Sequence, residues 1–141
     1  MTLFLFQKKV IFSARKTSGD EFDGPITFDT INVNIGGGMQ SNGKFIAPES
    51  GTYGFTFSGV TVFEKSVTTY VMVHKDGNFH HYIYDGNVKG VNNNINGSWM
   101  MKLAKGQVVH LDVTVGSLYV ETSTASIVPV IFTGNLLMLD E

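Results

Sequence analysis

Residues 51–63, with the sequence GTYGFTFSGVTVF, alternate between large apolar and small or polar side chains. Successive side chains of a β-strand point to opposite faces, so Tyr53, Phe55 and Phe57 share one face of a predicted strand. No stretch of the chain repeats its apolar residues at helical spacing for long enough to predict a helix. The sequence therefore predicts an all-β protein with an aromatic row in its core.

Short apolar runs recur along the rest of the chain and are separated by turn residues. They predict further strands at residues 10–14, 26–28, 68–74, 79–84, 98–103, 108–115 and 127–139, the last with a break near Gly134. Residues 75–77 and 85–87 are typical of tight hairpins, whereas residues 105–106 and 115–117 are predicted to end their strands. About eight to ten strands in a chain of this length favour a two-sheet sandwich or jelly roll.

Two longer stretches, residues 34–43 and 86–97, are predicted to be irregular. The first contains three consecutive glycines, but no Gly-Lys-Ser/Thr sequence follows them as in a phosphate-binding loop. We interpret it as a flexible connection between sheets.

Three segments are apolar on both faces of a predicted strand: Leu3–Phe6, Ile127–Phe132 and Leu136–Leu139. One face can fill the core of the sandwich. Because no helices are predicted to cover the other face, a second copy of the chain is the simplest cover, and we expect a homo-oligomer. The alternative is that these segments are central strands, buried from both sides within one chain.

Composition excludes several classes of protein. The 141 residues suit a single domain, and we divide them into an N-terminal strand or leader segment, residues 1–8, and a globular domain, residues 9–141. The net charge of −2 and the scattered basic residues argue against nucleic acid as a partner. No apolar run is long enough for a membrane span. The absence of cysteine excludes disulfides and thiolate chemistry.

The four histidines do not form a metal-binding pattern. His80 and His81 are neighbours and are expected on opposite faces of a strand, whereas His74 and His110 would meet if their strands pair. No Gly-x-Ser-x-Gly motif marks a nucleophile. We therefore predict that the protein is not an enzyme.

Carboxylates offer a weaker signal for cation binding. Asp76 and Asp85 flank the predicted strand at residues 79–84, and Asp20, Glu21 and Asp23 cluster in an early loop. Calcium takes six to eight oxygen ligands, so such loops are candidates for calcium sites, although surface carboxylates usually only solvate a turn. Calcium is thus the one cofactor left open, with Asp76 and Asp85 as candidate ligands. Asn96-Gly-Ser98 also fits a glycosylation sequon.

Several spaced blocks give the chain a resemblance to the globular domain of complement C1q, within the C1q and tumour-necrosis-factor-like superfamily. Met39 stands where the family pattern has an aromatic residue, and the loop before Phe45 is one residue short. Further similar blocks lie at residues 10–15, 43–48 and 132–137. The central positions that match the pattern are Phe28, Asn34, Phe45, Gly51, Tyr53, Phe55 and Phe57.

This resemblance implies a ten-strand jelly roll that assembles as a compact homotrimer. It also implies a secreted or extracellular recognition head, here without a collagen stalk, that binds carbohydrate or microbial-surface ligands through its loops. The alternative is a cytokine-like or adhesive ligand that binds a protein receptor in the grooves between subunits, and a third is a purely structural trimer. The loop residues predicted to contact the ligand are Lys75, Asp76, Asn78, His80, Asn87, Lys89, Asn92, Asn93 and Asn94.

Overall fold

The computed structural model describes residues 8–19, 21–62, 68–86, 92–120 and 128–140, and over these residues the chain forms ten β-strands and no helix. All strand pairs are antiparallel, which confirms the all-β prediction. The strands are β1 (Ile11–Lys16), β2 (Glu21–Pro25), β3 (Thr30–Ile35), β4 (Phe45–Ile46), β5 (Gly51–Thr61), β6 (Thr69–Lys75), β7 (Asn78–Asp85), β8 (Asn94–Leu103), β9 (Val108–Tyr119) and β10 (Val130–Leu139).

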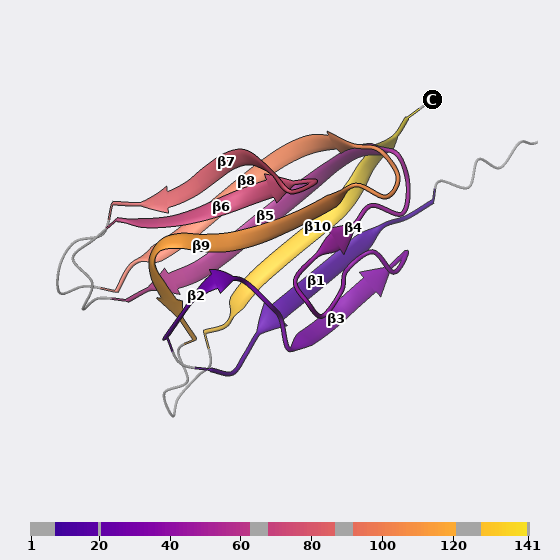
Figure 1. Ribbon diagram of the computed structural model, residues 1–141. Coiled ribbons are helices and arrows are strands. Elements are labelled where there is room, and N and C mark those ends of the chain that lie inside the picture. Colours follow the sequence, from indigo (N-terminus) through magenta and orange to yellow (C-terminus); the bar gives the residue numbers. More distant parts are fainter. Residues whose placement is uncertain (1–7, 20, 63–67, 87–91, 121–127, 141) are drawn as a thin grey trace, which may run out of the picture.

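The strands form two layers of a jelly-roll sandwich (Figure 1). Layer I has the order β3-β1-β10-β5-β8, and in layer II the strands β2 and β4 pair with β9, which is followed by β6 and β7. The layers are joined where Val60 and Thr61 at the end of β5 pair with Tyr119 and Leu118 of β9.

The core between the layers contains the predicted aromatic row. Tyr53, Phe55 and Phe57 are at most 2% exposed, and the Phe55 ring lies 5.8 Å from that of Phe132 on β10. Strand β10 is continuous through Gly134, so the predicted break there is wrong. A β-carbon at Gly134 would overlap the Phe12 ring, because this ring packs directly on the glycine backbone.

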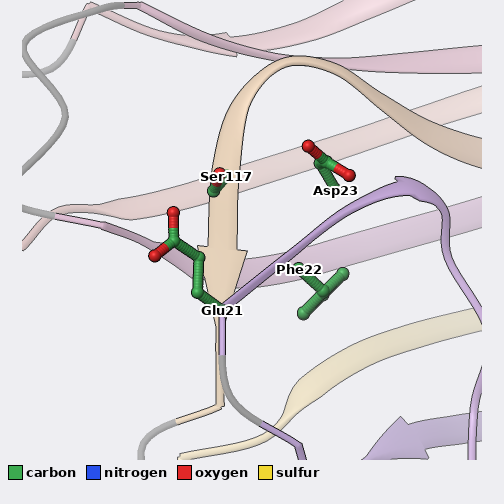
Figure 2. A pocket seen from close by; sticks show the side chains of 4 residues that line it. All are labelled: Glu21, Phe22, Asp23 and Ser117. Atoms are coloured by element: carbon green, nitrogen blue, oxygen red, sulfur yellow. The ribbon is translucent and has the colours of Figure 1, made fainter.

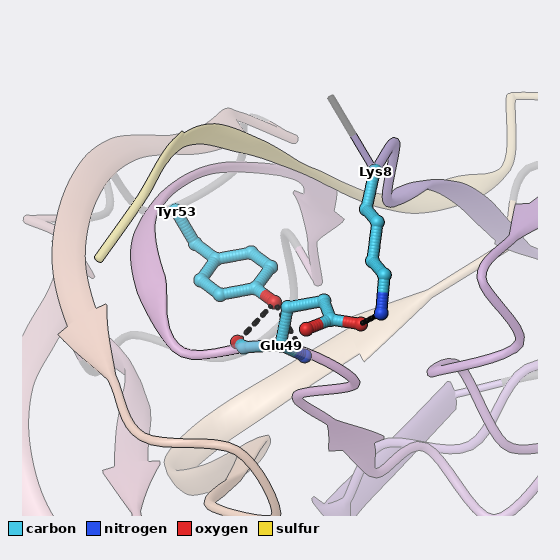
Figure 3. A network of polar contacts seen from close by, with 3 residues as sticks. All are labelled: Lys8, Glu49 and Tyr53. Atoms are coloured by element: carbon cyan, nitrogen blue, oxygen red, sulfur yellow. Dashed lines mark hydrogen bonds and ion pairs between the residues drawn. The ribbon is translucent and has the colours of Figure 1, made fainter. Parts of the chain in front are cut away.

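The phenol of Tyr53 fastens the start of β5 to the preceding loop (Figure 3). Its hydroxyl donates to the Glu49 carbonyl at 2.7 Å and accepts from the Glu49 backbone N–H at 3.3 Å. Burial raises the pKa of this phenol, so it stays a neutral donor. The Glu49 carboxylate in turn pairs with the Lys8 ammonium at 3.0 Å.

The triple-glycine segment connects β3 of layer I with β4 of layer II, as predicted. Gly36 and Gly37 have positive φ angles, which glycine adopts without strain. The Asn34 side chain holds this turn, since its amide donates to the Met39 carbonyl at 2.9 Å and its oxygen accepts the Met39 N–H at 3.0 Å. Met39 is 2% exposed, so it fills the core position expected for an aromatic ring.

Strands β3 and β4 were not predicted, and the ends of several other strands differ from the sequence predictions. Residues 26–28 are not a strand, because the polar segment Glu21–Pro25 pairs with β9 instead. Strand β8 begins at Asn94, inside the stretch predicted to be irregular, because its first residues pair with the end of β5. Strand β9 continues past Gly116, whose φ of 76° marks an irregularity and not a strand end.

The two predicted hairpins have different outcomes. Residues 75–77 do join the paired strands β6 and β7. The prediction at residues 85–87 is wrong, because β7 pairs with β6 in layer II whereas β8 pairs with β5 in layer I. Residues Leu3–Phe6 and Ile127, which belong to the doubly apolar segments, lie outside the described residues.

Candidate functional site

The predicted ligand residues fall at opposite ends of the sandwich. Lys75, Asp76, Asn78 and His80 lie on the β6–β7 hairpin, whereas residues 92–94 lie where β8 begins, at the other end in Figure 1. Strand β8 alone spans ten residues, or about 33 Å at the usual rise per residue. The two groups therefore do not form one site within one protomer. Asn87 and Lys89 lie outside the described residues.

The asparagines at the start of β8 contribute to the fold. The Asn92 amide donates to the Tyr119 hydroxyl at 2.6 Å. The backbone of Asn93 exchanges hydrogen bonds with Thr61 on β5: its N–H reaches the threonine hydroxyl at 3.1 Å, and its carbonyl accepts the Thr61 N–H at 2.8 Å. These contacts fasten the start of β8 to the end of β5. Asn94, which is exposed and pairs with Val60, lies at the same end of the sandwich.

The β6–β7 hairpin is a rigid two-residue turn. Asp76 and Gly77 have φ angles of 53° and 78°, the left-handed conformations that such hairpins require. The Asp76 carboxylate accepts the Val108 N–H at 3.0 Å and the Gln107 side-chain amide at 3.3 Å. Asp76 therefore ties the hairpin to β9, while Asn78 and His80 are exposed beside it.

Asp76 and Asp85 do not share a metal site. They lie at the two ends of β7, which spans eight residues from Asn78 to Asp85, or about 26 Å. One Asp85 carboxylate oxygen is buried without a hydrogen-bond partner. Over the part of the chain that the structure describes, no group of three or more His, Cys, Asp or Glu side chains is placed to hold a metal ion.

A bulge changes the expected arrangement of His80 and His81. Val73 pairs with His81 and His74 with Phe79, so His80 is the extra residue on β7. Its Nδ1 lies 2.7 Å from Nδ1 of His81, and the expectation that the two rings point apart is wrong. The His81 ring also meets Trp99 of layer I at 5.1 Å. Burial, and then the neighbouring His80, lowers the pKa of His81.

His74 and His110 pair across β6 and β9, as the sequence suggested. Their rings stack in parallel with centroids 4.3 Å apart, and His74 Nε2 lies 3.7 Å from Asp112 Oδ2. Burial lowers the pKa of His110, the nearby His74 and Lys44 lower it further, and Asp112 opposes them. The neutral form of the His110 imidazole is thus favoured.

Sequence reasoning missed an exposed aromatic face on layer II, formed by Tyr70, Phe79, Tyr82 and Tyr84. Phe79 is 58% exposed and Tyr84 is 62% exposed. The rings form a continuous series, with centroids 5.0 Å apart for Phe79 and Tyr82, 5.1 Å for Tyr82 and Tyr70, and 5.6 Å for Tyr70 and Tyr84. The alternation of Tyr82 and Tyr84 on β7 was the available signal, whereas the bulge at His80 puts Phe79 out of phase with them. This aromatic face adjoins the hairpin through Asn78 and Phe79.

The outer surface of layer I carries a different pattern, which we call the aliphatic row. The row has one residue from each of the five strands, and the strand register places these residues side by side. Leu137 and Met138 lie next to the row on β10. Met100 and Met138 are 68% and 67% exposed in a single chain. The row consists of Ile35, Ile11, Asn135, Gly54 and Met100.

Comparison with known families agrees with this architecture. The sequence profile of the C1q domain matches residues 10–137, most of the chain. The chain belongs to the C1q domain family. Domains of this family are typically secreted and trimeric, and they generally serve as recognition or ligand modules without enzymatic activity.

Two curated relatives support the assignment. Complement C1q tumor necrosis factor-related protein 3 from Homo sapiens and from Mus musculus are each 35% identical over 95 residues. That alignment covers 67% of this chain but only 38% of the length of either relative.

The solved structures share the fold of this C1q domain. The globular domain of zebrafish complement 1qA has a TM-score of 0.71 at 20% identity, covering 94% of this chain and 99% of its own. Murine APRIL at pH 5.0 also has a TM-score of 0.71, at 10% identity, over 92% of this chain and all of its own. Within the described residues, this C1q domain has no helix long and apolar enough to cross a membrane.

Proposed function

We propose that this C1q domain is a secreted, homotrimeric recognition module that binds carbohydrate on microbial or other surfaces through the β6–β7 hairpin and the adjoining aromatic face. The observation that carries the proposal is the position of Phe79, whose ring is 58% exposed directly beside Asn78 at a rigid turn. This combination of an exposed ring and a polar turn is the surface that a sugar ring fits.

The chemistry of each group supports this assignment. An aromatic ring can stack on the C–H face of a sugar, and the series from Phe79 to Tyr82 offers two such rings. The Asn78 amide provides both donors and acceptors for sugar hydroxyls, and Lys75 and His80 add further polar contacts. Asp76 contributes by holding the turn, since Val108 and Gln107 already donate to its carboxylate.

Trimerisation through the aliphatic row would supply the affinity that one shallow site lacks. Complete burial of a Met or Leu side chain contributes about 1.5–3 kcal/mol, so the exposed residues Met100, Leu137 and Met138 are a substantial driving force. Three linked sites then bind a repetitive surface with an avidity far above that of one site.

The second candidate function is a cytokine-like or adhesive ligand for a protein receptor. The cluster of Tyr70, Tyr82 and Tyr84 favours it, because tyrosine is enriched in the residues that contribute most to protein–protein binding. The partner would then cover the tyrosines and leave the hairpin at the rim.

A glycan array probed with the purified full chain tests the proposal. We expect a glycan signal that falls by about tenfold or more in Phe79→Ala and in Asn78→Ala, consistent with the loss of one stacked ring or one hydrogen-bonded pair per site. The matched control is Asn94→Ala, an exposed asparagine at the opposite end, which should bind as the wild type does. No glycan signal, together with a micromolar protein partner lost in Tyr82→Ala, would overturn the proposal in favour of the second function.

A further inference from the structure

The bulge of β7 brings two imidazoles together at an open side of the sandwich. Within the described residues, β7 pairs only with β6 in layer II, and β8 pairs only with β5 in layer I. The His81 ring meets the Trp99 ring of β8 at 5.1 Å, across the space between these two edge strands. His80, the bulged residue, is exposed beside His81. The two imidazoles are therefore open to solvent on one side and lie against the single tryptophan of the chain on the other.

The short distance between the two rings limits their protonation. The Nδ1 atoms of His80 and His81 lie 2.7 Å apart, so one of them donates a proton to the other and both cannot carry one. Burial, and then the neighbouring His80, lowers the pKa of His81. Near neutral pH the two rings thus share one proton between two nitrogens. Unprotonated imidazole nitrogen is the form that binds a metal ion, and binding releases such a proton.

The same distance is close to the spacing of two ligands on a square-planar ion. Imidazole nitrogens bind such metals at about 2.0 Å, so two neighbouring corners of a square-planar ion are about 2.8 Å apart, whereas two corners of a tetrahedral ion are about 3.3 Å apart. The observed 2.7 Å fits the first value better. Because His80 is exposed, its ring is free to rotate until both Nδ1 lone pairs point at one ion in place of the shared proton.

We propose that His80 and His81 form a binding site for copper(II) at the bulge of β7. Copper(II) takes square-planar or tetragonal sites of nitrogen and oxygen ligands, and water completes the coordination beside the two imidazoles. It is also the divalent first-row ion that a given set of ligands binds most tightly, ahead of nickel and zinc. The described part of the chain offers no third His, Cys, Asp or Glu side chain at this place, which suits an open site with bound water.

Tryptophan fluorescence of the full chain, followed during titration with copper(II) chloride in a glycine buffer, tests this site. Trp99 is the single tryptophan, and a copper ion on His81 should quench its emission because the two rings are in contact. We expect quenching that saturates at one ion per chain, with zinc at least about tenfold weaker. His80→Gln and His81→Gln should each weaken copper binding by at least about tenfold, since loss of even an outer-shell partner has an effect of this size.

The other two histidines provide a matched control. His74 and His110 also form a close pair, with stacked rings 4.3 Å apart, but both ring nitrogens of His74 and Nδ1 of His110 are buried. The double variant His74→Gln, His110→Gln should therefore bind copper as the wild type does. Electron paramagnetic resonance gives a second readout: coupling of copper to two imidazole nitrogens in the wild type and the control should drop to one in His80→Gln. Far-UV circular dichroism checks that each variant is folded.

Four results would overturn the proposal: no saturable quenching, unchanged copper affinity in both His80→Gln and His81→Gln, loss of binding in the control instead, or tighter binding of zinc than of copper. The site goes beyond the carbohydrate function, which needs no metal. Because His81 is not among the proposed glycan contacts, His81→Gln should lose copper and keep the glycan signal, and glycan arrays run with a chelator test the carbohydrate proposal separately.

Discussion

The two outer surfaces of the sandwich are both apolar but differ in chemistry. Layer I carries the aliphatic row, in which Asn135 is the one polar member. The exposed side chains of Met100 in the row and of Leu137 and Met138 beside it have no polar hydrogen-bonding group. Layer II carries the aromatic face, in which three of the four rings are tyrosines. The four histidines also all lie in layer II, on β6, β7 and β9.

This difference indicates two kinds of contact. Aliphatic side chains can be buried permanently without leaving a polar group unsatisfied, as in the core of an obligate interface. Tyrosine keeps a hydroxyl that needs a partner or water, which suits a wet and reversible contact. We therefore assign layer I to assembly of the trimer and layer II to ligand recognition.

Introducing a charge into each surface is the strongest way to separate these roles. Met100→Asp should abolish the trimer, weakening assembly by at least about 100-fold, because an unpaired carboxylate in an apolar interface costs several kcal/mol. Tyr84→Asp is the matched control, since Tyr84 is 62% exposed and Met100 is 68% exposed in one chain. Sedimentation velocity at micromolar concentration measures both.

The control should remain trimeric. If Tyr84→Asp dissociates the assembly and Met100→Asp does not, the assignment of the two surfaces is reversed.

Strand β7, which carries most of the aromatic face, is anchored to layer I through Ile83. A β-carbon at Gly97 on β8 would lie 2.7 Å from Ile83 Cδ1, so there is no space for a larger residue. Gly97→Val should lower the free energy of unfolding by about 1–3 kcal/mol through overpacking. Chemical denaturation measures the change, and Ser98→Ala on the exposed side of the same strand is the control. Wild-type stability in Gly97→Val would show that β7 is held in another way.

Lowering the pH should have a smaller effect on the stability of the fold, and this effect should arise from histidines in layer II. Burial lowers the pKa of both His81 and His110 below the ordinary value of 6.5. The unfolded chain then binds more protons near that pH, so stability increases with pH through this window and is lost below about pH 6.5. The Tm should be lower at about pH 5.5 than at about pH 7.5.

Replacing His81 and His110 together by glutamine should flatten this pH dependence. A difference in Tm that stays unchanged in the double variant would assign the effect to other groups.

Much of the fold could be predicted from sequence because its signals are local. The alternation at Tyr53, Phe55 and Phe57 predicts a strand with one face in the core, and all three side chains are buried. Strand β2 was missed because the charged segment 21–25 has no apolar period, and its partner β9 determines its structure. The Asn-rich start of β8 was missed for the same reason, since pairing with β5 overrides weak strand propensity.

The candidate site was less predictable, because sequence proximity does not show which loops meet. Lys75 and Asn94 lie at opposite ends of the sandwich, which follows from topology and not from either loop. The aromatic face depends on which side of β7 points outward, and the bulge at His80 changes that alternation. A recess lies between β2 and β9 and is lined by Glu21, Phe22, Asp23 and Ser117 (Figure 2). It depends on the irregular pairing of these two strands, which neither the acidic cluster near residue 21 nor Gly116 predicted by itself.

Hydroxyl-radical footprinting of the native protein, read by mass spectrometry, tests most directly whether layer I is covered and layer II is free. We predict that Met100 and Met138 are protected relative to the unfolded chain, whereas Tyr82 and Tyr84 react at rates expected for exposed tyrosine. Rapid oxidation of both methionines together with protection of both tyrosines would contradict the account.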